Sequence, residues 1–442
     1  MKKITYITCM VFGLMLKGQA QEKVWTLEEC MQYAVDHSPK VHIEEHTHNT
    51  YKAEHAQSIA SFLPAISTQV SAGYGFGRSV DDNYNYTNTT NFSNGYEAYT
   101  NLTLFSGGQL INGWRLARVN EKLGKNDIQK AKDDLAIKVM AAYVDVLYYE
   151  GTSRYAAEKL EESTRNFYKV TREQELGLKG KADVVQLEAQ VAEDDYFLTN
   201  QQNLYNTSLL TLKDYMNFPF DEKFQVDTTL INDVSLPAND QIDDILDFAL
   251  ENNPTALQLK HKLKASQMQH LIEKGKLLPT ISVSAGIYTD YYKDLKSKDT
   301  QVPFSDQLSN KRREYITFRL SFPLFDGLRK ITSVKRARNN VRIVREQQTE
   351  TIRQLQTAIE KAVLDREGYA KEMIQMEKKT TSDQYSYHVT LRKFEEGLMS
   401  PLDLQNSSNI LLQSRANLLQ RKLMFLIKCK EVDYYKGEPL VK

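Results

Sequence analysis

The sequence is poor in cysteine and tryptophan, with three and two copies among its 442 residues. Beyond its first 20 residues it also lacks any long apolar run. A helix needs about 20 predominantly apolar residues to cross a bilayer, so this part of the chain is not expected to cross one as a helix. Its 57 basic and 57 acidic residues cancel, which leaves no basic surplus for nucleic acid. No nucleophile elbow, phosphate-binding loop or zinc-protease motif occurs, so we expect neither an enzyme nor a cofactor.

The first 20 residues have the pattern of a secretory signal peptide. Two lysines precede an apolar stretch over residues 4–16, and small residues allow cleavage near Ala20. The protein is therefore expected to leave the cytoplasm. Of the cysteines beyond this segment, Cys30 and Cys429 occupy apolar positions of helical patterns. Two buried thiols are the simpler interpretation, and a disulfide in an oxidising compartment stays open.

The chain contains one pattern twice, at an offset of 215 and then 220 residues. The matching pairs are Leu63–Ser67 with Leu278–Ser282, Leu104-Phe105 with Leu324-Phe325, Gly177-Leu178 with Gly397-Leu398, and Asp183 with Asp403. A unit this long exceeds the 20–50 residue period of solenoids. We interpret residues 21–216 and 241–436 as two structural repeats, each with a helix, a β-hairpin and a long helical hairpin. Residues 217–240 form a linker, and 437–442 a short tail.

Two proline-free stretches, residues 110–175 and 328–396, are rich in strong helix formers. Each predicts a helix about 100 Å long at 1.5 Å per residue. Apolar residues in a heptad register, such as Ile352, Leu355 and Ile359, indicate coiled-coil packing. A glycine-containing turn and a second helix follow each stretch, so helical hairpins are expected over 109–216 and 328–436. Shorter helical segments are predicted at the start of each repeat, over 27–62 and 242–277.

After Pro64 and Pro279 the apolar period changes from 3.6 to 2, which predicts β-hairpins over 65–105 and 280–325. In the last predicted strand, Phe318 and Leu320 share one face, and Thr317 and Arg319 share the other. Strands about ten residues long with one apolar face are typical of transmembrane β-barrels. Long polar segments, 79–94 and 293–311, are expected to be extracellular loops.

Four strands are too few to close a barrel, which needs about eight. Open sheet edges do not occur in a bilayer, so several chains are expected to share one barrel. Two chains would supply eight strands and three would supply twelve, with a wider lumen. Of these we favour a homotrimer. The predicted fold class is therefore mainly α with a transmembrane β-barrel, internally duplicated, with the barrel completed by trimerisation and with Glu97 and Arg319 facing its lumen.

With these motifs in order and in duplicate, the sequence resembles the TolC family of outer-membrane efflux and secretion channels. Leu-Pro-x-Ile begins each first strand, Leu-Phe-x-Gly ends each second strand, and the tip turns carry Gly-Leu and a following aspartate. The resemblance implies a homotrimeric channel in the Gram-negative outer membrane that extends into the periplasm. It also implies a periplasmic adaptor protein and an inner-membrane pump as partners.

The resemblance assigns roles to residues of the two tips. It implies adaptor contacts for Gly177, Leu178, Lys179, Gly397, Leu398, Met399 and Ser400. It places Asp403 at the closed periplasmic gate, with Asp183 at the matching position of the first tip. The position of a second gate aspartate in the family is occupied here by Asn406. Copies of the chain would therefore form one ring of acidic residues at the gate and not two. Helix capping is the structural alternative for Asp403, and the two roles are compatible.

Other interpretations stay open at this point. Five of the eight histidines lie between His37 and His55, and His42 and His46 are one helical turn apart. This spacing suits a metal, but no third ligand is fixed, and a solvated polar helix is simpler. A structural or adhesive coiled-coil protein of the cell envelope is the alternative function. The sequence does not identify the cargo, whether drug, metal or protein.

Overall fold

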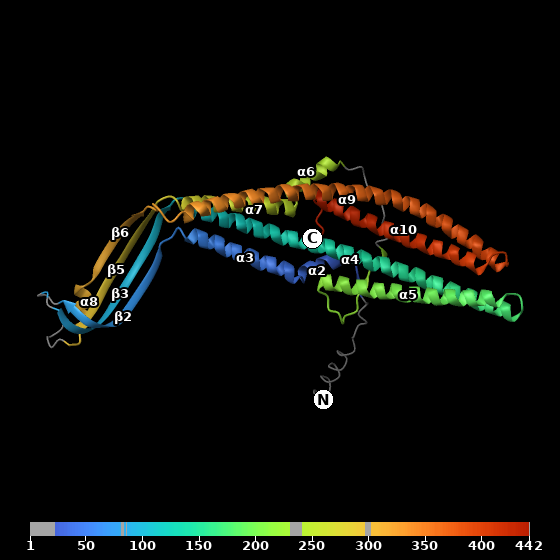
Figure 1. The fold of residues 1–442 in the computed structure, drawn as a ribbon, viewed down its shortest axis with the longest axis horizontal. Coiled ribbons are helices and arrows are strands. Elements are labelled where there is room, and N and C mark those ends of the chain that lie inside the picture. The colour runs from blue at the N-terminus through green and yellow to red at the C-terminus, as the bar shows by residue number, and fades with distance from the viewer. Residues whose placement is uncertain (1–22, 81–83, 85, 230–240, 297–301, 442) are drawn as a thin grey trace, which may run out of the picture. The chain divides into compact units, whose positions relative to one another are not determined.

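The computed structural model describes residues 23–80, 84, 86–229, 241–296 and 302–441 (Figure 1). The predicted signal peptide lies outside these residues. Contacts within the chain divide it into two compact units. Unit 1 comprises Met1–Glu44, Asp127–Leu257 and Thr351–Lys442, and unit 2 comprises Glu45–Asn126 and Gln258–Glu350.

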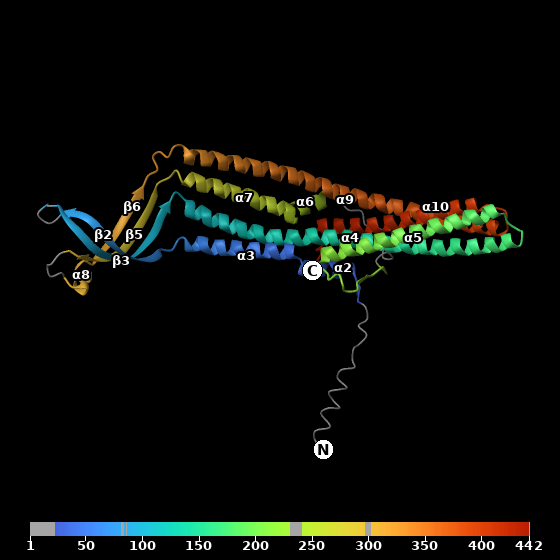
Figure 2. The ribbon, with the colours of Figure 1, turned by 60° about the horizontal axis from the view of Figure 1, so that its bottom comes forward.

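Two helices of 67 residues each, α4 (Gln109–Glu175) and α9 (Arg329–Glu395), run through both units. In unit 1 each turns back into a 36-residue helix, α5 (Lys181–Met216) and α10 (Pro401–Lys436), so that two antiparallel helical hairpins form (Figure 2). These bounds agree within three residues with the helices that composition and the proline-free stretches predict. Among the described helices, none is long and apolar enough to cross a membrane.

The helical segments at the start of each repeat are each broken in two. α2 (Leu27–Asp36) is followed by α3 (Pro39–Ala60), and α6 (Ile242–Asn252) by α7 (Pro254–Gly275). A proline starts the second helix in both cases, because its ring disfavours a helical conformation in the preceding residue and it fits the first turn of a new helix. At the second break, Asn253 has an extended backbone with φ −65° and ψ 130°.

The largest apolar core of unit 1 surrounds α4 at Tyr143, which is fully buried. Two short strands, β1 (Val24–Trp25) and β4 (Gln225–Val226), pair in parallel beside it. The Tyr143 hydroxyl lies 3.1 Å from the carbonyl oxygen of Trp25 and 2.8 Å from that of Asp227. One side chain of the first repeat thereby joins the N-terminal segment to the segment that follows α5.

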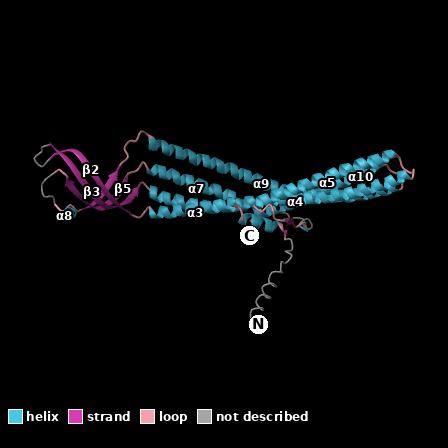
Figure 3. Ribbon diagram, turned by 90° about the horizontal axis from the view of Figure 1, so that it is seen from below, coloured by secondary structure: helices cyan, strands magenta, loops and turns pink. Residues whose placement is uncertain are grey.

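Unit 2 contains a four-stranded antiparallel sheet in the order β2-β3-β5-β6 (Figure 3). Its strands are β2 (Ala65–Val80), β3 (Tyr86–Ser106), β5 (Thr280–Asp294) and β6 (Arg313–Ser321). Each repeat contributes one hairpin, and the two hairpins meet where β3 pairs with β5. β2 and β6 form the two edges of this sheet.

The register places the predicted apolar residues of all four strands on one face. Val283 pairs with Leu102 on one side and with Phe318 on the other. The paired residues of antiparallel strands share a face, so the alternation read separately from each strand combines into one surface. Its members include Ile66 at 80% exposed, Phe318 at 74% and Leu320 at 56%. The sheet therefore presents an apolar face that this chain leaves uncovered.

Three features of the hairpins differ from the sequence prediction. Three strands have 15 to 21 residues instead of about ten. β2 and β3 are longer because the Thr- and Tyr-rich segment predicted as a loop over 79–94 is largely strand. Part of the predicted loop over 293–311 is a short helix, α8 (Phe304–Asn310). β6 ends at Ser321, before Leu324-Phe325, because Pro323 lacks the N–H that a sheet ladder needs.

The predicted faces also need one local correction in β3. The pairing of β3 with β5 shifts register between Thr103 and Phe105, so Leu104 lies in a β-bulge. Beyond the bulge, Phe105 takes the place opposite Ile281. A short distance farther, Gly107 has φ +64°, and a Cβ there would overlap the carbonyl oxygen of Gly275. Only glycine fits this close approach between the end of the strand and α7.

Candidate functional site at the hairpin tips and the sheet

Both hairpin tips begin with the same helix-ending turn. Gly177 has φ +77°, its N–H bonds Gln174 O at 2.9 Å, and the Leu178 N–H bonds Glu173 O at 2.9 Å. Gly397, at φ +78°, and Leu398 repeat these bonds at 3.0 and 2.8 Å. This pair of bonds defines a Schellman motif, in which the left-handed residue is usually glycine. The glycines of the two tips therefore have a structural role whatever else they do.

The leucines after these glycines are not explained by the turn. A Schellman motif is often accompanied by an apolar contact between this position and the last turn of the helix. Here that turn offers charged residues, Arg172 and Glu173 in the first tip and Arg392 and Lys393 in the second. Leu178 and Leu398 are each 71% exposed. The turn thus leaves both leucines without an apolar partner, and Leu176 at 65% and Leu402 at 51% are exposed beside them.

Other predicted tip residues pack inward. Met399 lies against a core formed by all four long helices in unit 1, with members that include Val170, Leu187, Phe394 and Leu404. The Lys179 ammonium lies 5.7 Å from the centre of the Phe394 ring. Lys179 and Met399 are only partly exposed, so they tie the two tips together and offer less surface to a partner than the leucines do.

Asp403 is the third residue of α10. The capping alternative placed it at the N-cap, and that position is wrong. Ser400 is the N-cap, and its hydroxyl oxygen accepts a hydrogen bond from the Asp403 N–H at 3.2 Å. The Asp403 carboxylate accepts from the Ser400 N–H at 3.1 Å and from its hydroxyl at 2.7 Å. These two bonds lower the pKa of Asp403 below its ordinary value. The reciprocal bonds form a capping box, and Asp403 remains exposed to solvent.

The first tip has half of this arrangement. The Asp183 carboxylate accepts from the Gly180 N–H at 3.3 Å, but glycine has no side chain to return a bond. Asp183 is partly exposed, and Asn406, one turn beyond Asp403, is exposed. A gate role for these three residues depends on how copies of the chain meet, so it stays a prediction.

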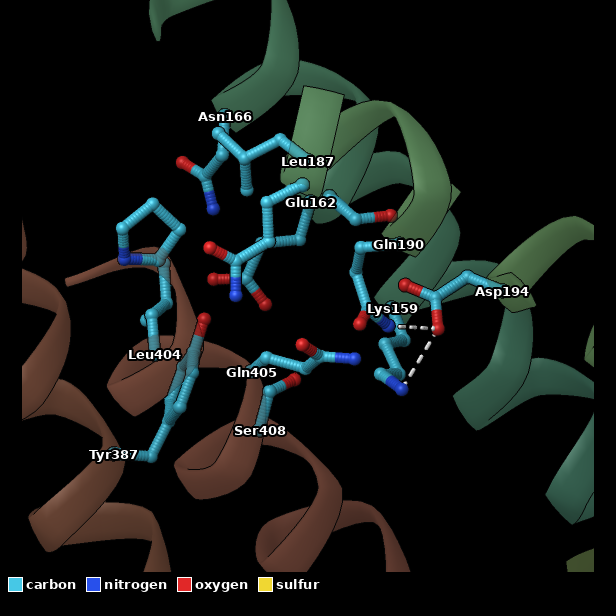
Figure 4. Close-up of a pocket in the computed structure, with 13 residues that line it drawn as sticks. Lys159, Glu162, Asn166, Leu187, Gln190, Asp194, Tyr387, Leu404, Gln405 and Ser408 are labelled. Atoms are coloured by element: carbon cyan, nitrogen blue, oxygen red, sulfur yellow. Dashed lines mark hydrogen bonds and ion pairs between the residues drawn. The ribbon is translucent and has the colours of Figure 1, made fainter. Parts of the chain in front are cut away.

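A small polar pocket lies among α4, α5, α9 and α10 near the tips (Figure 4). The Lys159 ammonium lies 2.7 Å from Asp194 Oδ1, and their side chains are 11% and 2% exposed. Gln190 donates to the same oxygen at 2.7 Å. Burial raises the pKa of Glu162, which also lines the pocket. Sequence reasoning missed this buried ion pair, because Lys and Asp 35 residues apart carry no local motif.

The face of the sheet opposite the apolar one carries the predicted lumen residues. The Tyr315 hydroxyl donates to Glu97 at 3.0 Å and spans β5 to do so. The tyrosine can cross the strand because Gly286 lies beneath it, where a Cβ would come within 2.7 Å of the hydroxyl. Arg319 shares this face, since its pairing partner is Ser282. Glu97 and Arg319 therefore lie on the polar side of the sheet.

The histidine cluster does not converge on one point. His37 stacks on Tyr33, His55 lies 2.6 Å from the Glu121 carboxylate, and His42 and His46 are exposed. Among the described residues, no three His, Cys, Asp or Glu side chains are placed to hold a metal ion. Cys30 and Cys429, for which a disulfide was left open, are both free thiols.

The geometry defines a class of chain: a duplicated helical hairpin joined to an open sheet whose apolar face is exposed. A family model described as outer membrane efflux protein matches residues 31–217 and 245–429, one match for each repeat. The chain belongs to this family of outer-membrane efflux proteins.

Solved structures share the fold. VceC of Vibrio cholerae, an outer membrane protein, has a TM-score of 0.80 at 14% identity, over 94% of this chain and 96% of that one. CusC gives 0.78 at 16% identity over 95% of both chains. The outer membrane channel MtrE of Neisseria gonorrhoeae gives 0.77 at 14% over 94% and 89%. The comparison with curated proteins found no match.

Proposed function

We propose that the protein is a passive conduit in the outer membrane of a Gram-negative cell, the outermost part of a tripartite efflux or type I secretion system. The observation that carries the proposal is the sheet, with an exposed apolar face and two edges. Membership of the efflux family supports a channel over the structural or adhesive alternative.

The sheet supports a shared barrel. Its apolar face suits lipid, and the opposite face, with Glu97, Thr317 and Arg319, suits a water-filled lumen. A bilayer does not tolerate open strand edges, so β2 of one copy would pair with β6 of another. Three copies would give a twelve-stranded barrel with a lumen wider than eight strands allow.

The tips support the docking and gating roles. Leu178 and Leu398 offer exposed apolar side chains without a partner in the turn, as expected of residues that meet a periplasmic adaptor protein. Threefold symmetry would bring three copies of the exposed Asp403 carboxylate together at the entrance. The inner-membrane pump would select the cargo, which the conduit itself does not determine.

Chemical crosslinking of the detergent-extracted protein tests the proposal. Crosslinking should convert the monomer band into a three-chain species at low protein concentration, with circular dichroism reporting full strand content in the same sample. A dilution series is the control, because random collisions lose crosslinks on dilution and a closed barrel does not. A stable monomer with full strand content, or a two-chain end point, contradicts the trimer.

A further inference from the structure

The membrane-proximal part of unit 2 carries a basic stripe that occurs in both repeats. In α9 it consists of Lys335, Arg338, Arg342 and Arg345, and at the 220-residue offset in α4 of Arg115, Arg118, Lys122 and Lys125. Every member of the first set is matched by a basic residue in the second. Between residues 329 and 345 there are seven basic residues and no acidic one.

The stripe occupies one face of each helix. Its spacing of three, four and three residues covers an arc of about 80° at 3.6 residues per turn. All eight side chains are exposed, and none forms an ion pair within the described part of the chain. Arg118 has one contact, its guanidinium lying 5.8 Å from the centre of the Trp114 ring.

In unit 2, α4 packs through other faces than the one that carries the stripe. α3, α4, α7 and α9 form one layer there, as Figures 2 and 3 show. α4 meets α3 through Gly124, where a Cβ would touch His48 and Tyr51, and through the bond between Glu121 and His55. Val119 and Leu123 are buried on a further side of α4. The stripe of α4 therefore lies on a surface of the helical layer and not within it, and the four basic side chains of α9 are exposed in the same way.

In both helices an exposed isoleucine precedes the basic stripe on the same face. Ile111 and Ile331 precede the first basic residue by four positions and so share its face, and they are 50% and 46% exposed. Ile111 lies five residues after the end of β3, and Ile331 lies ten residues after the end of β6. An exposed isoleucine followed by basic residues repeats the order met on leaving a bilayer, from hydrocarbon to anionic headgroups. On a face that lined an aqueous lumen, the exposed isoleucines would be unfavourable because water would surround them.

We infer that this surface, the isoleucine and four basic residues of each helix, binds the anionic lipid headgroups of the inner leaflet. The inference rests on the proposed place of the sheet in the outer membrane. Measured from the isoleucines at 1.5 Å per residue, the first two basic positions lie about 6 and 10 Å away. Their long side chains reach back to the headgroup layer. The last two positions lie about 16 and 21 Å away. They add a weaker electrostatic attraction to the headgroups, because that attraction falls off within a Debye length.

The test compares lipid preference in two variants with the same loss of charge. The full chain and each variant are reconstituted into vesicles of phosphatidylcholine with or without phosphatidylglycerol, and native mass spectrometry counts retained lipids. Lys335→Gln removes one stripe charge, and Arg336→Gln removes one charge from another face of the same helix at the same depth. A basic residue at an anionic surface contributes about a fivefold preference. The stripe variant should therefore lose about fivefold of its phosphatidylglycerol preference and the control variant much less.

Further arms separate the outcomes. Lys335→Arg keeps the charge and should retain the preference, and 0.5 M salt should weaken it in the native chain. Equal losses in the stripe and control variants, or no preference in the native chain, overturn the inference. Stronger binding to soluble poly-glutamate than to anionic vesicles assigns the stripe to an anionic polymer and also overturns it. Failure of the native chain to insert into either vesicle instead contradicts the proposed outer-membrane function.

Discussion

Apolar side chains are exposed in two regions of this protein for different physical reasons. In the sheet they recur at every second residue on one face of four paired strands, from Ile66 to Leu320. At the tips they are confined to a few residues in and beside the two turns, among them Leu178 and Leu398, each after a left-handed glycine. Exposed apolar side chains thus form a continuous surface on the sheet and occur only locally at the tips.

The difference indicates which medium covers each region. A periodic surface that no other element covers suits a solvent that is itself apolar, as the lipid chains are. An exposed leucine on a rigid turn suits a pocket in another protein, where a single buried side chain contributes much of the binding energy. Four predictions test or sharpen this comparison, in order of decreasing effect.

The largest effect is expected from a charge on the apolar face of β6. Leu320→Arg places a charge in lipid, which costs about 2–4 kcal/mol at mid-depth, in every chain of the barrel. Thr317→Arg is the matched control, because it adds the same charge to the polar face, where Arg319 already lies. We expect Leu320→Arg to reduce the heat-stable oligomer on gels far more than Thr317→Arg. Equal tolerance would show that the apolar face does not meet lipid.

Charges at the two tip leucines should remove adaptor docking and leave the oligomer intact. Loss of a buried apolar anchor costs about 2 kcal/mol or more, which is roughly a 30-fold loss of affinity. Leu178→Asp/Leu398→Asp should therefore abolish efflux in cells, as measured by sensitivity to an exported toxic compound. Leu176→Glu is the control, since the second tip has Glu396 at the matching position. Normal efflux by the double variant would remove docking from these leucines.

A smaller effect is expected at the N-terminus of α10. Ser400→Ala removes the side chain that accepts from the Asp403 N–H, at a cost of about 1 kcal/mol. Ser400→Gly reproduces the N-cap of the first tip, Gly180, and should cost only a few tenths of that. Hydrogen exchange of the amides at the start of α10 measures the difference. Equal protection in all three proteins would show that the box does not stabilise the tip.

The smallest effect is expected on ion selectivity. If Asp403 lines the entrance, three copies raise the local cation concentration, and Asp403→Ala should weaken cation preference in planar bilayers. Asn406→Asp should strengthen it, and Asp183→Asn is the control from the first tip. Because the Ser400 bonds lower the pKa of Asp403, the carboxylate keeps its charge to a lower pH than usual. The preference should thus reach half of its loss at a pH below 3.8, the ordinary pKa. Changed amide protection without changed selectivity would make Asp403 a cap only.

The long helices could be predicted because their causes are local. A stretch without proline and rich in helix formers fixes α4 and α9 to within a residue or two of their ends. The faces of the strands could be predicted for the same reason, since apolar and polar residues alternate within each strand separately. The breaks at Pro39 and Pro254 are also local, and attention to these prolines would have found them.

Other features could not be predicted because they depend on distant partners. The pairing of β3 with β5 joins the two repeats, and no residue of either strand encodes its neighbour. The buried pair of Lys159 and Asp194 forms only when α4 and α5 are folded against each other. The bulge at Leu104 arises from the register between strands.

By itself the sequence determined the duplication, the long helices and the two faces of each strand, because each depends on the residue types within one segment. Only the tertiary structure decided that Lys159 pairs with the buried Asp194 and that Leu178 and Leu398 stay exposed. It also decided that Tyr315 crosses Gly286 to reach Glu97. These features depend on backbone geometry and on side chains brought together from separate segments, which spacing along the chain does not specify.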